Sequence, residues 1–308
     1  MTGAGSRPPV TVVVCSRDRP AMLAVALARM GAALGPDDEL LVVDSASRTD
    51  ETGVVARAAG ATVVRSERGG LSVARNLGWR SARHAIVAYT DDDVTIDPGW
   101  VDALGGVFVA HPEASFASGA VLIPAGQEGV SLPVAVFDGE QPRRFDATSG
   151  DPPGMGASFA FRVEALARIG GFDEELGAGR PLSAEDLDAF DRLIATGAIG
   201  WFEPSARSWH DQWRTRWERL TLEWEYAQGN GARLAKLARL DRRRLRLVGR
   251  IVVVDWCFEP LGRHVRGRHE YLVAVDLVRL VGVAVGVVRG GSRRLAGGHF
   301  RPRTRGRT

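Results

Sequence analysis

Three consecutive carboxylates are the clearest candidates for chemistry in this chain. Asp91, Asp92 and Asp93 follow directly after residues 85–90, an apolar run typical of a buried strand. Adjacent carboxylates repel one another, and a divalent cation that prefers oxygen ligands would offset that repulsion. The motif therefore predicts a cation site, and a solvated Asp-rich turn is the alternative interpretation.

A second acidic pair, Glu185 and Asp186, lies near the start of the amphipathic segment 183–196. Ser183 is a suitable N-cap, which would place both acids in the first turn of a helix. Acids there can compensate the helix dipole, a contribution of roughly 0.3–1 kcal/mol, or one of them can serve as a general base. These residues alone leave both interpretations open.

Two further residues could contact a nucleotide. Asp44 follows the apolar run 39–43, where a carboxylate could accept hydrogen bonds from a base or a ribose hydroxyl, although a loop Asp is also a common turn former. Arg75 lies early in a helix led by Gly69 and Gly70, where an arginine could clamp a phosphate. An ordinary surface arginine is the alternative at that position.

His210 comes after the short apolar run 206–209, and a lone histidine is more often structural than a ligand. Tryptophans recur around and after it at helical spacings, at positions 209, 213, 217 and 224. We interpret them first as core or groove lining and second as a sugar-stacking surface.

These side chains need a scaffold that brings them together. Strands are predicted at 10–15, 39–43, 61–65 and 85–90, with helices between them. This alternation predicts a parallel sheet covered by helices on both faces. Ligands of such sheets bind at the carboxyl ends of the strands, where Asp44 and Asp91 would meet.

The later part of the chain is predicted to extend this unit. Residues 124–154 are rich in Pro, Gly and Asp and are predicted to be a surface insertion. A strand at 157–161, helices at 163–169 and 183–196, short strands at 199–202 and 206–209, and a helix from about 212 to 240 follow. The last helix is a candidate for a break at 229–231, where two glycines flank an asparagine.

Composition and charge narrow the class of protein. The chain has 308 residues, of which 45% are hydrophobic and 25% charged, so collagen-like, disordered and miniature folds are excluded. Its two cysteines, Cys15 and Cys257, cannot form a disulfide framework and favour a reducing compartment. The first apolar run, 10–15, is too short for a signal peptide.

The net charge of +3 hides a strong asymmetry. Residues 231–308 carry 19 basic and 5 acidic side chains, a net charge of +14, whereas residues 1–230 carry a net charge of −11. This pattern predicts a catalytic body with a segment that meets anions. The apolar run 271–288 contains Asp276 and Arg279, so it is a poor membrane-spanning helix; we expect it to lie at an anionic membrane surface, with a helical cap or a dimer interface as alternatives.

In their order along the chain these motifs resemble family 2 glycosyltransferases, the inverting GT-A enzymes that use nucleotide-activated sugars. The matching segments are 15–17, 42–47, 71–76, 89–94, 154–158, 170–174, 185–186 and His210. The resemblance covers about residues 10–240. One departure is Ser158, where many members have asparagine.

The resemblance implies a role for each candidate. Asp44 would read the nucleotide base, Arg75 would contact the diphosphate, and Asp91 would lie on the ribose side. Asp93 of the D-x-D motif and His210 would hold a divalent metal, Mn²⁺ or Mg²⁺. Asp186 would be the catalytic base, with Glu185 beside it. The remaining residues assigned to the nucleotide-sugar site are Arg17, Asp92, Gly156 and Ala157.

The implied fold is α/β, a GT-A (Rossmann-like) domain with a mostly parallel sheet. We expect this domain at 1–240, with a nucleotide-binding half at about 8–123 and an acceptor half at about 154–240. An Arg-rich helical segment, 241–308, follows as a membrane-associating appendage. The implied enzyme is a hexosyl- or related transferase that acts on a glycolipid, polysaccharide or cell-envelope glycan, in the cytoplasm at the inner face of the cell membrane. We expect no nucleic-acid partner.

Other classes fit less well. A dinucleotide oxidoreductase would have G-x-G-x-x-G after the first strand, and a nucleotidyltransferase would have a glycine-rich loop there, but this chain has residues 15–20 without glycine. An aspartyl-nucleophile phosphotransferase could use Asp91 and Asp93, yet such enzymes carry that motif on the first strand. A non-catalytic sugar-nucleotide-binding relic is the last alternative.

Overall fold

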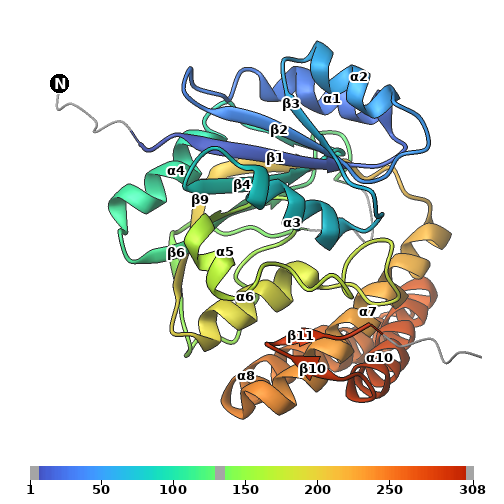
Figure 1. Ribbon diagram of the computed structural model, residues 1–308. Coiled ribbons are helices and arrows are strands. Elements are labelled where there is room, and N and C mark those ends of the chain that lie inside the picture. Colours follow the sequence, from blue (N-terminus) through green and yellow to red (C-terminus); the bar gives the residue numbers. More distant parts are fainter. Residues whose placement is uncertain (1–6, 129–135, 303–308) are drawn as a thin grey trace, which may run out of the picture.

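The computed structural model describes residues 7–128 and 136–302. A nine-stranded sheet forms its centre, in the order β3-β2-β1-β4-β8-β6-β9-β5, with β7 paired to β9 (Figure 1). The strands are β1 (Val10–Ser16), β2 (Glu39–Asp44), β3 (Thr62–Arg65), β4 (Ile86–Asp91), β5 (Val94–Ile96), β6 (Ala114–Leu122), β7 (Arg143–Phe145), β8 (Phe159–Arg162) and β9 (Ile199–His210). The predicted α/β class is confirmed.

The half of the sheet that the sequence predicted most clearly is parallel. Strands β3, β2, β1 and β4 pair side by side in the same direction. Valines of β1 are fully buried at positions 10, 12, 13 and 14, as expected for a strand covered on both faces. The carboxyl ends of β1, β2 and β4 therefore lie at one edge of the sheet.

The second half of the sheet is mixed. Strand β8 runs antiparallel to both β4 and β6, and β5 and β7 run antiparallel to β9, whereas β6 and β9 are parallel. The two short strands predicted around 199–209 are in fact one strand, β9. Its register with β6 shifts between Glu203 and Arg207, a segment that contains Pro204, which has no N–H to donate to the ladder. Part of the predicted insertion also joins the sheet, as strand β7.

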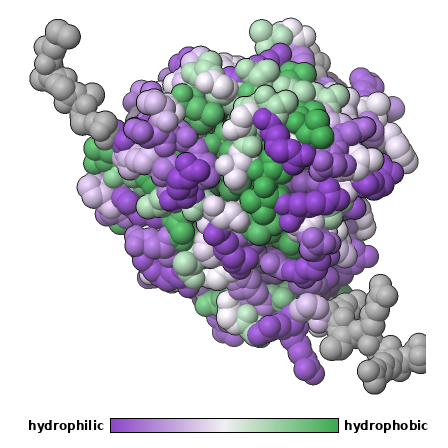
Figure 2. Space-filling view, turned by 45° about the horizontal axis from the view of Figure 1, so that its top comes forward, coloured by the Kyte–Doolittle hydropathy of each residue, from purple (hydrophilic) through white to green (hydrophobic). Residues whose placement is uncertain are grey.

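Helices surround the sheet (Figure 1). They are α1 (Pro20–Met30), α2 (Glu51–Ala58), α3 (Leu71–Ser81), α4 (Trp100–Ala110), α5 (Val163–Arg168) and α6 (Glu185–Ala195). Behind the carboxyl edge, a buried cluster of aromatic rings joins the sheet to α6 and to the turn before it, through Phe116, Phe159, Phe161, Phe172 and Phe190. Hydrophilic residues cover most of the face drawn in Figure 2, with smaller hydrophobic areas between them.

The C-terminal part of the described chain is helical, as predicted. It comprises α7 (Arg216–Leu240), α8 (Arg242–Arg250), the π-helical segment η1 (Ile251–Phe258), α9 (Glu259–Arg266), α10 (Glu270–Gly291) and a small hairpin of β10 (Leu295–Ala296) and β11 (His299–Phe300). Helices α7 and α10 lie side by side (Figure 1). The last six residues of the predicted appendage lie outside the described residues.

Helix α7 continues without a break through Gly229 and Gly231. A capping box of Thr215 and Glu218 begins it. The glycines serve close packing instead of a turn, since a Cβ at Gly229 would overlap Ser183 and one at Gly231 would overlap the backbone of α10. The signal read as a candidate break therefore marks the contact surface of the helix.

Candidate active site

Asp91, Asp93 and His210 come together at the carboxyl edge of the sheet. Each offers one ligand atom, and these atoms all lie within 4.8 Å of one another. Antiparallel pairing of Val94 on β5 with His210 on β9 brings the histidine to the turn that follows β4. Nε2 of His210 lies 3.5 Å from Oδ1 of Asp93. Two carboxylates and an imidazole are a donor set that fits Mn²⁺ or Mg²⁺.

The electrostatics of this cluster favour a bound cation. Enclosure of the Asp91 carboxyl raises its pKa to about 7, with Arg75 opposing the effect and Asp93 and Asp92 adding to it. Burial also raises the pKa of Asp92, although Ser16 and Arg19 oppose it. A divalent cation would keep these carboxylates ionised at neutral pH.

Asp92 is not part of the group formed by Asp91, Asp93 and His210. Its carboxylate accepts hydrogen bonds from Ser16 Oγ at 2.6 Å and from Nη1 of Arg19 at 3.1 Å. These contacts tie the turn after β4 to the end of β1. In this structure Asp92 shapes the turn that presents its two neighbours.

Asp44 lies at the end of β2, as predicted, and is 1% exposed. Its carboxylate accepts from Nη1 of Arg65 at 2.6 Å and from the backbone N–H of Ser47 at 2.9 Å. Arg17, at the end of β1, has a half-exposed side chain that lies against Gly69, in the turn before α3. Both residues thus lie at the edge that carries Asp91.

Arg75 is almost completely buried, and its guanidinium is the centre of the site's hydrogen bonding. Nη1 donates to Oε1 of Glu185 at 2.6 Å, and Nη2 donates to the carbonyl of Gly156 at 3.1 Å and lies 3.5 Å from Oδ1 of Asp91. Its carbon CZ lies 5.2 Å and 5.7 Å from the ring centroids of Phe159 and Phe172. The residue predicted to contact a diphosphate thus joins β4, α6 and the 154–158 turn.

The acidic pair at the start of α6 is divided between two environments. Glu185 is buried and paired with Arg75, and burial raises its pKa in spite of that partner. Asp186 is partly exposed, and its Oδ1 accepts only the local backbone N–H of Leu187 among the hydrogen bonds found in the described chain. A Cβ added at Gly156 would lie 3.4 Å from Oδ2 of Asp186 and 3.2 Å from Nη2 of Arg75, so Asp186 borders the same turn.

The prediction that Ser183 caps α6 is wrong. The N-cap is Ala184, in a left-handed conformation with φ 69°, and it makes no side-chain cap. Ser183 instead donates its hydroxyl to the carbonyl of Glu225 on α7. A non-glycine residue with positive φ is costly, and such strain occurs most often at functional sites.

The turn at 154–158 contains two residues predicted to bind the nucleotide sugar, Gly156 and Ala157, and these lie in different surroundings. Gly156 faces Arg75 and Asp186, whereas Ala157 is 1% exposed and belongs to the core. Ser158, at the position where many family members have asparagine, accepts a hydrogen bond of 2.8 Å from Nε1 of Trp100. The departure from the family pattern therefore lies in the core behind the site.

Sequence reasoning missed the cationic side chains around Asp93. Nε1 of Trp213 donates to Oδ2 of Asp93 at 3.1 Å, and guanidinium groups of Arg19 and Arg214 each lie 3.9 Å from the same oxygen. Both arginines stack on the Trp213 ring. Nη1 of Arg214 is buried and has no hydrogen-bond partner within the described chain. The only sequence signal was the Trp-Arg pair shortly after His210.

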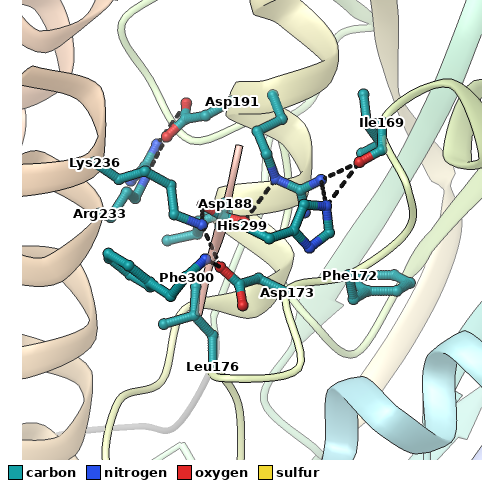
Figure 3. Close-up of polar contacts among 12 residues, drawn as sticks. Ile169, Phe172, Asp173, Leu176, Asp188, Asp191, Arg233, Lys236, His299 and Phe300 are labelled. Carbon is teal, nitrogen blue, oxygen red and sulfur yellow. Dashed lines mark hydrogen bonds and ion pairs between the residues drawn. The ribbon is translucent and has the colours of Figure 1, made fainter. Parts of the chain in front are cut away.

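Helix α6 is held from behind by ion pairs with the C-terminal helices (Figure 3). Nζ of Lys236 on α7 lies 2.6 Å from Asp173 and 2.7 Å from Asp188. Arg233 on α7 and Arg244 on α8 both pair with Asp191. All six side chains are buried. The first turn of α6, which carries Glu185 and Asp186, is thus fixed relative to α7.

Known proteins resemble this chain in sequence and in fold. The family model for glycosyl transferase family 2 matches residues 11–170. A pre-mycofactocin glycosyltransferase of Mycobacterium tuberculosis is 31% identical over 172 residues, which are 54% of this chain and 35% of the relative. The chain thus spans about a third of the length of the curated relatives it matches.

Two solved structures share the fold. The mannosyltransferase PcManGT from Pyrobaculum calidifontis, in complex with GDP-Man and Mn²⁺, has a TM-score of 0.65 at 19% identity and covers 92% of this chain and 87% of its own. S. aureus TarS 1–349, in complex with UDP-GlcNAc, has a TM-score of 0.54 at 16% identity and covers 92% and 89%. Since the family model spans half of the 308 residues, the chain belongs to glycosyl transferase family 2, and it has the GT-A fold.

Proposed function

We propose that this enzyme transfers a sugar from a nucleotide-diphosphate sugar to an acceptor hydroxyl, with inversion at the anomeric carbon and with Asp186 as the general base. The observation that carries the proposal is the grouping of Asp91, Asp93 and His210 at the sheet edge. Arg75 lies between this group and the partly exposed Asp186. That arrangement supplies a place for a metal diphosphate and a place for a base.

The charged residues at the sheet edge support the proposed donor site. Asp93 and His210, with Asp91 beside them, would hold Mn²⁺ or Mg²⁺, and this ion would offset the charge of the leaving diphosphate. PcManGT holds GDP-Man with Mn²⁺ and TarS holds UDP-GlcNAc, which supports a nucleotide sugar as the donor here. Asp44 and Arg17 would contact the nucleoside, and Arg75 would face the diphosphate.

On the acceptor side, we assign different roles to Glu185 and Asp186. Asp186 would take the proton of the acceptor hydroxyl as its oxygen attacks the anomeric carbon from the side opposite the diphosphate. A single displacement of this kind inverts the anomeric centre. Glu185 is engaged by Arg75 and would keep that guanidinium in place instead of acting on the acceptor.

We further infer that the acceptor is a glycolipid, polysaccharide or cell-envelope glycan, and that the enzyme works in the cytoplasm at the inner face of the cell membrane. The support is the net charge of +14 in residues 231–308 against −11 in the rest of the chain. In this proposal residues 1–240 form the transferase domain and residues 241–308 the membrane-associating appendage. The aspartyl-phosphotransferase alternative loses its basis, because the Asp91 motif lies on β4 of a family 2 fold.

A screen of nucleotide sugars tests the proposal. Release of nucleoside diphosphate would be measured with Mn²⁺, with Mg²⁺ and with excess EDTA, for the wild type, for Asp93→Ala and for the exposed control Asp37→Ala. We expect release that requires a divalent ion, is lost in Asp93→Ala and is normal in Asp37→Ala. Unchanged release in EDTA would refute the metal assignment, and donor binding without any turnover would favour the non-catalytic alternative.

A further inference from the structure

Helix α10 presents an apolar strip to the outside of the molecule. Among its exposed residues, Leu277, Val281 and Val288 are 50%, 55% and 72% exposed, and the exposed Ala274 and Ala284 complete the same helical face. Together these five side chains, here called the α10 strip, span about 21 Å along the helix axis at 1.5 Å per residue. No charged residue interrupts them between 274 and 288 on that face. A continuous exposed apolar strip of this length marks an interaction surface.

The opposite face of α10 explains why its two charged residues lie in an apolar run. Asp276 and Arg279 are buried against α7 and α9. Nε of Arg279 donates to Glu223 at 2.7 Å, and Nδ1 of His264 lies 2.7 Å from Asp276. Both charges have ion-pair partners inside the protein, so they do not interrupt the outward strip.

Helix α10 is long and apolar enough to cross a membrane by length and composition. In this fold, however, one face of α10 packs on α7, a helix that carries charged residues along its length, including Arg219, Glu223 and Arg233. If α10 spanned the membrane, either the charged helix α7 would enter the hydrocarbon core or α10 would lose its ion pairs. Only the outward face of α10 is available to lipid, which is the arrangement of a helix lying in the plane of the interface.

The exposed charged residues of the C-terminal part indicate which kind of partner the α10 strip would bind. From α8 to the hairpin, in residues 242–300, the exposed basic residues are Arg242, Arg243, Arg246, Arg250, Arg263, Arg266, Arg268, Arg289 and Arg294, against the exposed acids Asp255, Glu259 and Glu270. Arg263, Arg266 and Arg268 stand before the start of α10, and Arg289 stands at its end. An apolar face bordered by arginines complements an anionic lipid surface.

We propose that the α10 strip, with the arginines at both of its ends, docks this enzyme on an anionic membrane surface. This docking proposal deepens the proposed function. It depends on that function for one point, the idea that a lipid-linked acceptor is presented to the site. The geometry supports that idea: α7 begins just after Trp213 and Arg214 beside Asp93, and the start of α10 lies next to the start of α7, where Tyr271 donates its hydroxyl to the Arg216 carbonyl.

Vesicle flotation tests this surface directly, without donor or acceptor. Phosphatidylcholine vesicles with and without phosphatidylglycerol would be mixed with the full chain, with Leu277→Glu/Val281→Glu, and with Val25→Glu/Val54→Glu. The control pair lies on α1 and α2 and is matched in exposure, at 52% and 56%. A third variant, Arg263→Gln/Arg266→Gln, removes charge at the start of the strip. Thermal unfolding and nucleoside diphosphate release check that each variant is folded.

We expect the wild type to float with phosphatidylglycerol vesicles and to be released at about 1 M salt, where charges are screened within a few ångströms. Leu277→Glu/Val281→Glu should bind roughly tenfold more weakly, the arginine variant should also bind more weakly, and the control should match the wild type.

Equal flotation of the strip variant and the wild type, or no flotation of the wild type, would overturn the proposal. So would light scattering that shows a wild-type dimer converted to a monomer by Leu277→Glu/Val281→Glu, because the strip would then bind a second copy. Nucleoside diphosphate release is independent of flotation, so failure of the docking surface and failure of the transferase assignment give different results.

Discussion

The guanidinium of Arg75 on α3 donates a 2.6 Å hydrogen bond to the carboxylate of Glu185 at the start of α6, across 110 residues of sequence. Both side chains are buried, and burial of the pair means that neither partner can be removed cheaply. The pair has a functional consequence. Of the two adjacent acids, Glu185 is paired with an arginine, whereas Asp186 is partly exposed and is the one proposed as the general base.

Replacement of Asp186 by asparagine tests this division. Asp186→Asn keeps the size of the side chain but removes its basicity, so turnover should fall by roughly 10²–10⁴-fold, while donor affinity by calorimetry stays near that of the wild type. Glu185→Gln serves as the comparison and should affect stability as well as turnover. Near-normal turnover of Asp186→Asn would move the base role to Glu185.

Metal binding can be measured apart from catalysis. Asp93→Ala and His210→Ala each remove one ligand atom from the group that Asp91 completes, so both should weaken Mn²⁺ binding in calorimetry without donor. Asp93→Ala should also reduce transfer below detection. Mn²⁺ binding that is identical in the wild type and both variants would show that the ion, if used, binds elsewhere.

The sequence predicted the positions of Asp91 and His210 at the ends of strands, because strand ends are a local property. Each of the two is the last residue of a strand with a recognisable apolar pattern. Ligands of open α/β sheets bind at the carboxyl edge, where such strand ends meet. The boundaries of β1, β2 and β4 were correct to within about one residue for the same reason: their apolar runs are short, continuous and bounded by polar residues.

What the sequence could not predict depends on contacts between distant segments. Nothing in the spacing of Ser183 and Glu185 shows that the Ser183 hydroxyl would bond to α7 and leave Ala184 as the N-cap. The glycines at 229 and 231 look like a helix break because their role lies in the close approach of α10 and Ser183. Arg214 was overlooked because its nearness to Asp93 appears only when β9 pairs with β5.

Arg214 should contribute to donor binding. Its Nη1 is buried and lacks a hydrogen-bond partner in the described chain, and its guanidinium stands beside Asp93. A charged hydrogen bond to a phosphate is worth about 1.5–3 kcal/mol, so Arg214→Met should raise the KM for the donor roughly 10- to 100-fold. Kinetics with Arg207→Met, an exposed arginine of β9, provide the control. Equal KM values for the two variants would exclude the contact.

Lys236 should be essential for the stability of the fold around α6. It is 2% exposed and pairs with two buried carboxylates, Asp173 and Asp188 (Figure 3). Lys236→Met leaves both acids without this partner, and breaking a buried pair costs about 3–5 kcal/mol in the free energy of unfolding. Urea titration measures the loss. A variant as stable as the wild type would show that Arg192 and the backbone N–H of Phe300 satisfy these acids without the lysine.

His299 should make this region sensitive to mild acid. Nε2 of His299 lies 2.8 Å from the carbonyl oxygen of Ile169 and 3.1 Å from Nη1 of Arg192, and burial together with that guanidinium lowers the pKa of the imidazole (Figure 3). A histidine whose pKa is lower in the folded protein than in the unfolded chain takes up its proton more readily when unfolded. The free energy of unfolding should therefore be highest above the unfolded pKa of about 6.5 and fall as the pH drops below it. Because other histidines also titrate, the test is the difference between the wild type and His299→Gln in urea titrations at about pH 7.5 and 5.5. We expect the variant to lose less stability over this interval than the wild type, and parallel curves would contradict the assignment.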